Sequence, residues 1–187
     1  MSTTTDWFLE NEERQCSLWI HQQFGLEITA EDQTGIWDGL YDDYRAMLDA
    51  QHAEYLWLER HSHNQFFREF SADLKTATSL LTHVGSGAQA NTICKLVYAH
   101  AVTLLEALIS TVVRKLVISE QSLMLTLVAE YDELSRRTIT LKQIAQDPEV
   151  VQGIVLKVLS GVTFHNVATI REILGAMFGE HMRGGLS

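Results

Sequence analysis

Two histidines, His100 and His165, stand where an imidazole would have a chemical use. His100 interrupts the apolar segment 96–105 (LVYAHAVTLL), and Glu106 follows that segment directly. Burying either His100 or Glu106 without a partner costs on the order of 1–3 kcal/mol. We therefore expect both side chains to face a partner, a groove or solvent, where an imidazole exchanges protons near neutral pH.

His165 lies in the segment 161–166 (GVTFHN), just before the predicted last helix. Asn166 is the expected N-cap of that helix, where backbone N–H groups are free and the helix dipole is positive. Capping explains Asn166 but requires no imidazole at position 165, so packing and a polar site both stay open for His165. A phosphate here would be oriented by Asn166, with positive charge from Lys157 or Arg171.

The histidines do not form a metal-binding pattern. The chain has eight of them, yet no Glu-x-x-His pair, which a di-iron bundle needs twice. Cys16 and Cys94 stand alone, which excludes a cysteine-rich zinc site, and Glu59 and His63 are expected on one polar helix face. The motifs of hydrolases, phosphate loops and dinucleotide-binding folds are absent as well. We expect no metal and no cofactor.

Helices must position these side chains, because apolar residues follow a 3.6-residue period and the chain has one proline. A first helix is predicted to stop at Gly25. Thr29 and Asp32 have the spacing of an N-terminal cap for a second helical segment, whose apolar pattern runs to residue 81. That pattern is either one long bent helix or two helices with a break at 61–64, and the glycines at 85 and 87 end it.

The apolar stripe from Ile93 to Val117 predicts a long helix that forms the centre of the fold, with Leu104 and Leu108 in the core. Later helices are expected to begin at three caps and to end with a helix from Asn166 to Gly175 or Gly179; the caps are Ser122, Thr140 and Asp147. The predicted fold is an all-α helical bundle with a long central helix.

Charge divides the chain. Residues 1–75 hold 15 acidic and 5 basic side chains, whereas residues 76–187 hold 9 of each. We expect a single domain over 1–187, with an acidic helical part over 1–84 and a helical core over 88–180. The acidic part is either a solvated face or a surface for a basic partner protein. RNA, which needs cations, would have to bind the neutral part or a groove shared between subunits.

The segment 96–109 (LVYAHAVTLLEALI), followed by 158–166 (VLSGVTFHN) and 170–178, resembles the HEPN superfamily of small helical-bundle domains. It is similar to uncharacterised bacterial members in which a "yah…E" helix precedes an "fHN" turn and the last helix. The resemblance covers about residues 90–180, and it implies the HEPN-like helical core expected over 88–180. Residues 1–84 resemble no known family.

This resemblance implies a homodimer that acts as a metal-independent endoribonuclease or RNA-binding component of a bacterial defence or toxin–antitoxin system. Family members place an Arg-x4–6-His motif from each subunit at the interface, and Lys95 with His100 has that spacing with Lys instead of Arg. His165 and His100 would then be catalytic, while Asn166, Lys157, Arg171 and Lys95 would bind RNA. The spacing is absent after six arginines: Arg60, Arg68, Arg114, Arg136, Arg137 and Arg171.

The alternative is a non-catalytic helical module that binds a partner protein as a scaffold or neutralising subunit. Both hypotheses place the protein in the cytoplasm, because the chain starts with an acidic segment and uses only two cysteines. No membrane contact is expected, since the apolar run 96–105 is too short to span a bilayer.

Overall fold

The computed structural model describes residues 4–32, 35–85 and 87–179, and in these ranges it contains helices and no strand. The all-α fold class predicted from the sequence is confirmed. The chain divides into two compact units, Met1–Trp57 and Leu58–Ser187. The division therefore falls within α2, before the segment 63–79.

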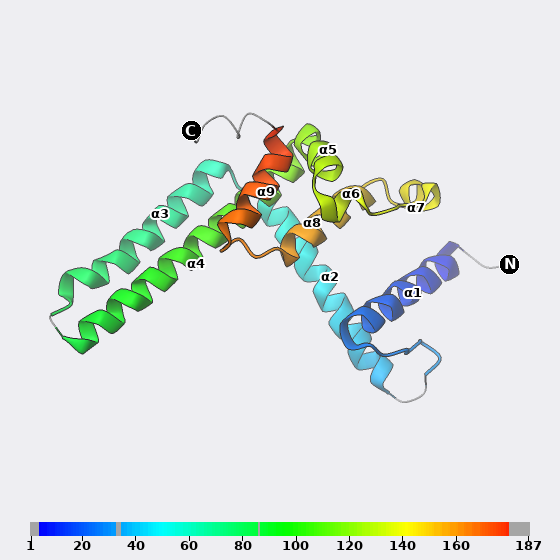
Figure 1. Cartoon of the computed structure of the whole chain (residues 1–187). Helices are drawn as coiled ribbons and strands as arrows, with labels where there is room; N and C mark the ends of the chain where they lie inside the picture. The colour runs from blue at the N-terminus through cyan, green and yellow to red at the C-terminus, as the bar shows by residue number, and fades with distance from the viewer. Residues whose placement is uncertain (1–3, 33–34, 86, 180–187) are drawn as a thin grey trace. The chain divides into compact units, whose positions relative to one another are not determined.

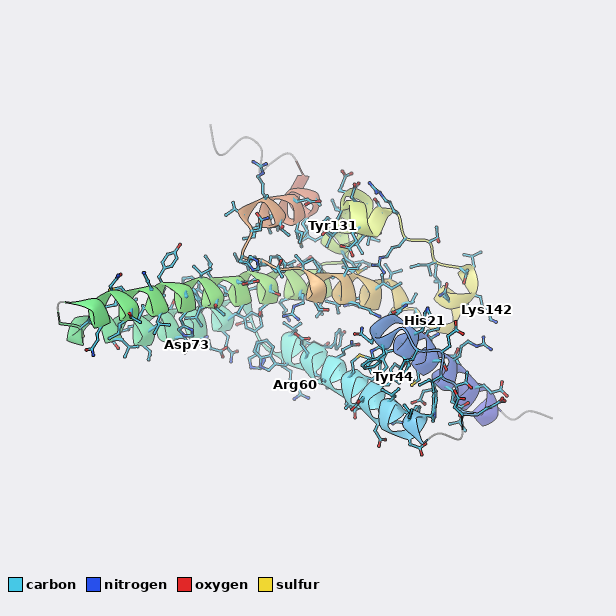
Figure 2. All side chains as sticks on the ribbon, turned by 60° about the horizontal axis from the view of Figure 1, so that its bottom comes forward. His21, Tyr44, Arg60, Asp73, Tyr131 and Lys142 are labelled. Carbon is cyan, nitrogen blue, oxygen red and sulfur yellow. The ribbon has the colours of Figure 1, made fainter. Side chains whose placement is uncertain are left out.

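The first unit is a pair of helices, α1 (Thr4–Phe24) and most of α2 (Ile36–Arg60). Gly25 ends α1 with a φ of +68°, a left-handed conformation that favours glycine, and its N–H bonds the His21 carbonyl. The small core of this unit comes from both helices, and Figure 2 labels one of its members, Tyr44. Its buried residues are Cys16, Ile20, Trp37 and Tyr44.

The predicted cap at Thr29 is wrong. Asp32 accepts a hydrogen bond from the Thr29 N–H at 2.9 Å, and the Asp32 N–H bonds the Thr29 carbonyl at 3.0 Å. These two bonds close an isolated turn, and α2 begins only at Ile36.

The whole net charge of −10 belongs to the first unit, which holds 12 acidic and 2 basic side chains over residues 1–57. One of its two cations, Arg45, pairs with Glu12 at 3.2 Å. The second unit holds 12 side chains of each sign and is neutral. The acidic part of the chain is thus a separate helical pair.

The second unit starts with a helical hairpin of α3 (His63–Ser79), a 3-10 turn η1 (Leu80–His83) and α4 (Ala88–Ser119). The two long helices run side by side in opposite directions (Figure 1). Ser62 caps α3 by accepting from the Gln65 N–H, so of the two alternatives the break near 61–64 is confirmed. Gly87, with a φ of +128°, precedes α4 as the glycine pattern predicted.

In the described residues five shorter helices follow α4, and their packing against it forms the main core. They are α5 (Gln121–Glu130), α6 (Asp132–Ser135), α7 (Leu141–Gln146), α8 (Val150–Gly161) and α9 (Val167–Phe178). The core includes Val113 and Val117 of α4, Leu127 of α5, Leu159 of α8 and Ile173 of α9.

The caps before these helices are confirmed in part. Thr140 forms the predicted capping box with Gln143, and Asn166 caps α9. Ser122 is not a cap, because α5 already begins at Gln121. Asp147 accepts from the Glu149 N–H at 2.9 Å, but it closes a turn and α8 starts only at Val150.

The prediction that α4 is the central, most buried helix is wrong for its first half. Val113 and Val117 are each 1% exposed, whereas Leu96 is 64% and Tyr98 is 73% exposed. Leu104, predicted in the core, is only half-buried. The physical reason is length: α4 has 32 residues, and the short helices after it pack on its second half, whereas α3 and η1 accompany the first.

The helix over Gln89–Ser119 is long and apolar enough to cross a membrane, judged by length and composition alone. The sequence argument considered only residues 96–105, and the helix continues without a break well beyond them. Core helices of soluble proteins pass the same test, although in this case only 11% of the apolar window is buried. One such helix is weak support for a membrane span.

Candidate functional site

The side chain of Glu106 joins the middle of α4 to the turn before α9. One of its oxygens, Oε1, accepts a hydrogen bond from the Phe164 backbone N–H at 3.0 Å. The same oxygen lies 3.2 Å from Nδ1 of His165. An ionised carboxylate can only accept, so this contact requires the proton on Nδ1 and leaves Nε2 of a neutral imidazole as an acceptor.

Residues on both sides of His165 fix the turn. Phe164 is 2% exposed and belongs to the main core, which anchors the segment after α8 ends. Asn166 accepts from the Ala168 N–H at 2.9 Å and so starts α9. With a buried residue before it and a cap after it, the His165 backbone has little freedom, and Glu106 holds the imidazole from a second helix.

The pair is accessible to a ligand. The His165 side chain is 59% exposed and the Glu106 side chain 28% exposed. A carboxylate that orients an imidazole through Nδ1 leaves Nε2 able to take up or release a proton. The turn also lies at the N-terminus of α9, where free backbone N–H groups favour an anion. The arrangement is therefore capable of proton transfer beside a bound anion.

Lys157 and Arg171 are exposed on the two helices that flank this turn, α8 and α9. Within the described ranges neither side chain forms an ion pair. Arg171 lies four residues into α9, or about 6 Å along its axis at about 1.5 Å per residue. Both cations are free to bind an anion, but neither contacts His165 directly.

The structure does not bring His100 to this site. His100 and Glu106 are six residues apart on α4, which is about 9 Å along the axis and about 240° around it at 100° per residue. His100 instead lines a groove between α3 and α4 together with Asp73. Lys95 is exposed on the same helix. The two predicted catalytic histidines thus belong to different faces of one chain.

Two features were not predicted from the sequence. Glu106 was expected to need a partner, but that partner, His165, lies 59 positions away. Arg14 with His21 and Arg45 with His52 both have the Arg-x6-His spacing. Both of these pairs lie in the acidic first unit, where the field repels phosphate.

The described residues contain no cluster of three or more side chains that suits a metal ion. Glu59 and His63 do not share a helix face, because α2 ends at Arg60 and α3 begins at His63. The sequence-based expectation of one continuous polar face is wrong at this break.

No known protein family, curated protein or solved structure gives a significant match to this chain.

Proposed function

We propose that this protein is a HEPN-like, metal-independent endoribonuclease or RNA-binding component of a bacterial defence or toxin–antitoxin system. The observation that carries the proposal is the contact between Glu106 and Nδ1 of His165 at 3.2 Å. Glu106 belongs to the "yah…E" helix and His165 to the "fHN" turn. The contact therefore joins the two parts of the resemblance in one candidate site.

In this proposal Nε2 of His165 accepts the proton of a ribose 2′-hydroxyl. The 2′-oxygen then bonds to the adjacent phosphorus, the bond from phosphorus to the 5′-oxygen breaks, and the leaving oxygen receives a proton from the imidazolium. The products are a 2′,3′-cyclic phosphate and a 5′-hydroxyl, so protons and electrons balance. Lys157 and Arg171 would stabilise the charge on the phosphate oxygens.

Asn166 and the pair of Lys95 and His100 have supporting roles in the proposal. The Asn166 Oδ1 is used for capping, which leaves its amide N–H₂ to donate to a phosphate. Lys95 and His100 lie on another face of α4, where a second copy of the chain would bring them to the RNA bound at His165. We therefore propose a homodimer, in which RNA binds across two neutral units.

The test is cleavage of an end-labelled RNA in the presence of EDTA by the wild type and by His165→Ala. Loss of a general acid or base lowers the rate by about 10²-fold or more, while the melting temperature stays close to that of the wild type because His165 is exposed. His21→Ala and His52→Ala are the matched controls, and both are expected to keep wild-type activity. Equal cleavage by His165→Ala, or loss of activity in either control, contradicts the assignment.

A non-catalytic module that binds another protein is the second candidate. It is favoured by the exposed apolar side chains on the α3–α4 hairpin, among them Leu80, Leu96 and Tyr98. In that case wild-type protein cleaves no RNA in the same assay, and His165 serves only to fix the turn before α9.

A further inference from the structure

A groove of about 830 Å³ runs between α3 and α4. Aliphatic side chains of η1, of the turn after it and of α4 form most of its lining: Leu80, Val84, Ile93, Leu96, Val97 and Leu104. The groove lies on the first half of α4, which the core helices do not cover. We propose that it binds an amphipathic basic helix of a partner protein.

The polar groups in the groove select a cation. Thr76 and Ser79 donate their hydroxyl hydrogens to carbonyls of their own helix, at 2.9 and 2.7 Å. The groups that remain for a ligand are the Asp73 carboxylate and the His100 imidazole. Among the described residues no Lys or Arg lines the groove. Figure 2 labels Asp73 on the α3 side of the hairpin.

The dimensions suit a helix of three to four turns. From Ile93 to Leu104 the lining extends about 17 Å along α4 at about 1.5 Å per residue. A partner helix of about 12–15 residues would place apolar anchors at i, i+4 and i+7 against this length. One Lys or Arg beside these anchors would reach Asp73, which is exposed.

Charge argues against a second copy of this chain in the groove. A two-fold contact brings the same surface of each copy together, so two acidic grooves would face each other without a basic side chain between them. A basic side chain of a different protein would instead pair with the Asp73 carboxylate of the groove. The partner is therefore basic.

Charge also argues against a membrane. α3 packs along the first half of α4 and carries Arg68, Glu69, Asp73 and Lys75. Insertion of the hairpin into a bilayer would bury all four, and charged side chains inside membranes are costly. The groove is separate from the Glu106–His165 pair, but it includes His100, which has a supporting role in the proposed function.

The experiment measures binding of a fluorescein-labelled, amphipathic Leu/Lys peptide of about 14 residues to the full chain at about 150 mM salt. A shuffled Leu/Lys peptide and an amphipathic Leu/Glu peptide are the control probes. Asp73→Lys is compared with Glu130→Lys, and Leu96→Gln with Leu125→Gln; both control positions are exposed on α5.

We expect each groove variant to weaken binding of the amphipathic Leu/Lys peptide at least about tenfold, and each control variant to change it by less than about twofold. Equal binding of the shuffled peptide, or equal effects of Glu130→Lys and Asp73→Lys, would show unspecific attraction and overturn the proposal. Tight binding of the Leu/Glu peptide would contradict the proposal that the partner helix is basic. If Leu96→Gln disperses an oligomer, the groove binds a second copy of the chain and the proposal is wrong. If the wild-type protein floats with vesicles, the groove binds lipid and the proposal is wrong as well.

Discussion

Glu106 and His165 meet at 3.2 Å although 59 positions separate them. The carboxylate that holds the imidazole also accepts the backbone N–H of Phe164, the residue before it. Glu106 therefore fixes both the conformation of the turn and the orientation of the ring. This double contact links the middle of α4 to the turn before α9.

The double role of Glu106 predicts different effects for two substitutions. Glu106→Ala removes the acceptor of the Phe164 N–H, which costs about 1–3 kcal/mol when the donor stays unpaired. Glu106→Gln keeps an acceptor oxygen in place, so we expect the loss to be under about 1 kcal/mol. Urea unfolding followed by far-UV circular dichroism measures both values. Equal losses in the two variants would show that the hydrogen bond to Phe164 does not support the turn.

Stability separates His165 from its neighbour Asn166. His165→Ala truncates a side chain that is 59% exposed, and most surface changes stay within about 0.5 kcal/mol. Asn166→Ala removes the cap of α9 and should cost about 1 kcal/mol. Thermal unfolding of the two variants is the measurement. If His165→Ala lowers the free energy of unfolding by more than about 3 kcal/mol, the imidazole supports the fold, and the assignment of His165 to an exposed site is wrong.

Local signals in the sequence were sufficient for most helix ends. Gly25 and Gly87 have the positive φ that glycine tolerates, and Thr140 and Asn166 are followed by the expected partners of a cap. The caps predicted at Thr29 and Asp147 failed because a carboxylate at cap spacing also closes isolated turns. Such patterns predict a local turn of the backbone, but they do not show whether a helix begins there.

Burial and the candidate site were harder to predict. The apolar period of α4 shows which side chains avoid water, but it does not show how many helices are present to cover them. In the same way, the sequence indicated that Glu106 needs a partner, and only the packing of α4 against the turn before α9 identifies His165. Contacts between distant segments depend on the tertiary structure. Local patterns in a single sequence do not show which two segments will meet.

The corrected position of the core predicts a contrast between two leucines. Leu159 is fully buried between α8 and its neighbours, so Leu159→Ala should cost about 2–5 kcal/mol. Leu104 is half-buried beside the groove, and Leu104→Ala should cost under about 1 kcal/mol. Far-UV circular dichroism during urea unfolding compares them. If Leu104→Ala lowers the free energy of unfolding more than Leu159→Ala does, the first half of α4 belongs to the core after all.

The proposed homodimer needs an apolar face other than the acidic groove. Tyr98 and Leu105 are 73% and 47% exposed and lie seven positions apart, hence on one face of α4. Leu105→Glu should convert a dimer into a monomer in sedimentation at tens of micromolar, because like charges would face each other across a two-fold axis. Leu125→Glu, at an exposed position of α5, is the control. Wild-type protein that sediments as a monomer would remove the homodimer and the shared RNA site with it.

The last prediction concerns the stability of the first unit at high pH. Burial, and next the charge of Glu12, raise the pKa of the Cys16 thiol above its ordinary value of 9.0. Burial, and next the charge of Cys16, raise the pKa of Tyr44 above 10.0. Both groups are uncharged when protonated, so at high pH the unfolded chain releases protons that the folded chain retains.

The stability of the first unit should therefore be unaffected by these groups below about pH 9 and should fall as the pH rises further. All four tryptophans lie in residues 1–57, so their fluorescence during urea unfolding reports mainly on this unit. Cys16→Ala is the matched variant, and its stability should fall less steeply above pH 9 although it starts lower. A wild-type stability that stays constant across this range would contradict the burial of Cys16 and Tyr44 in the core between α1 and α2.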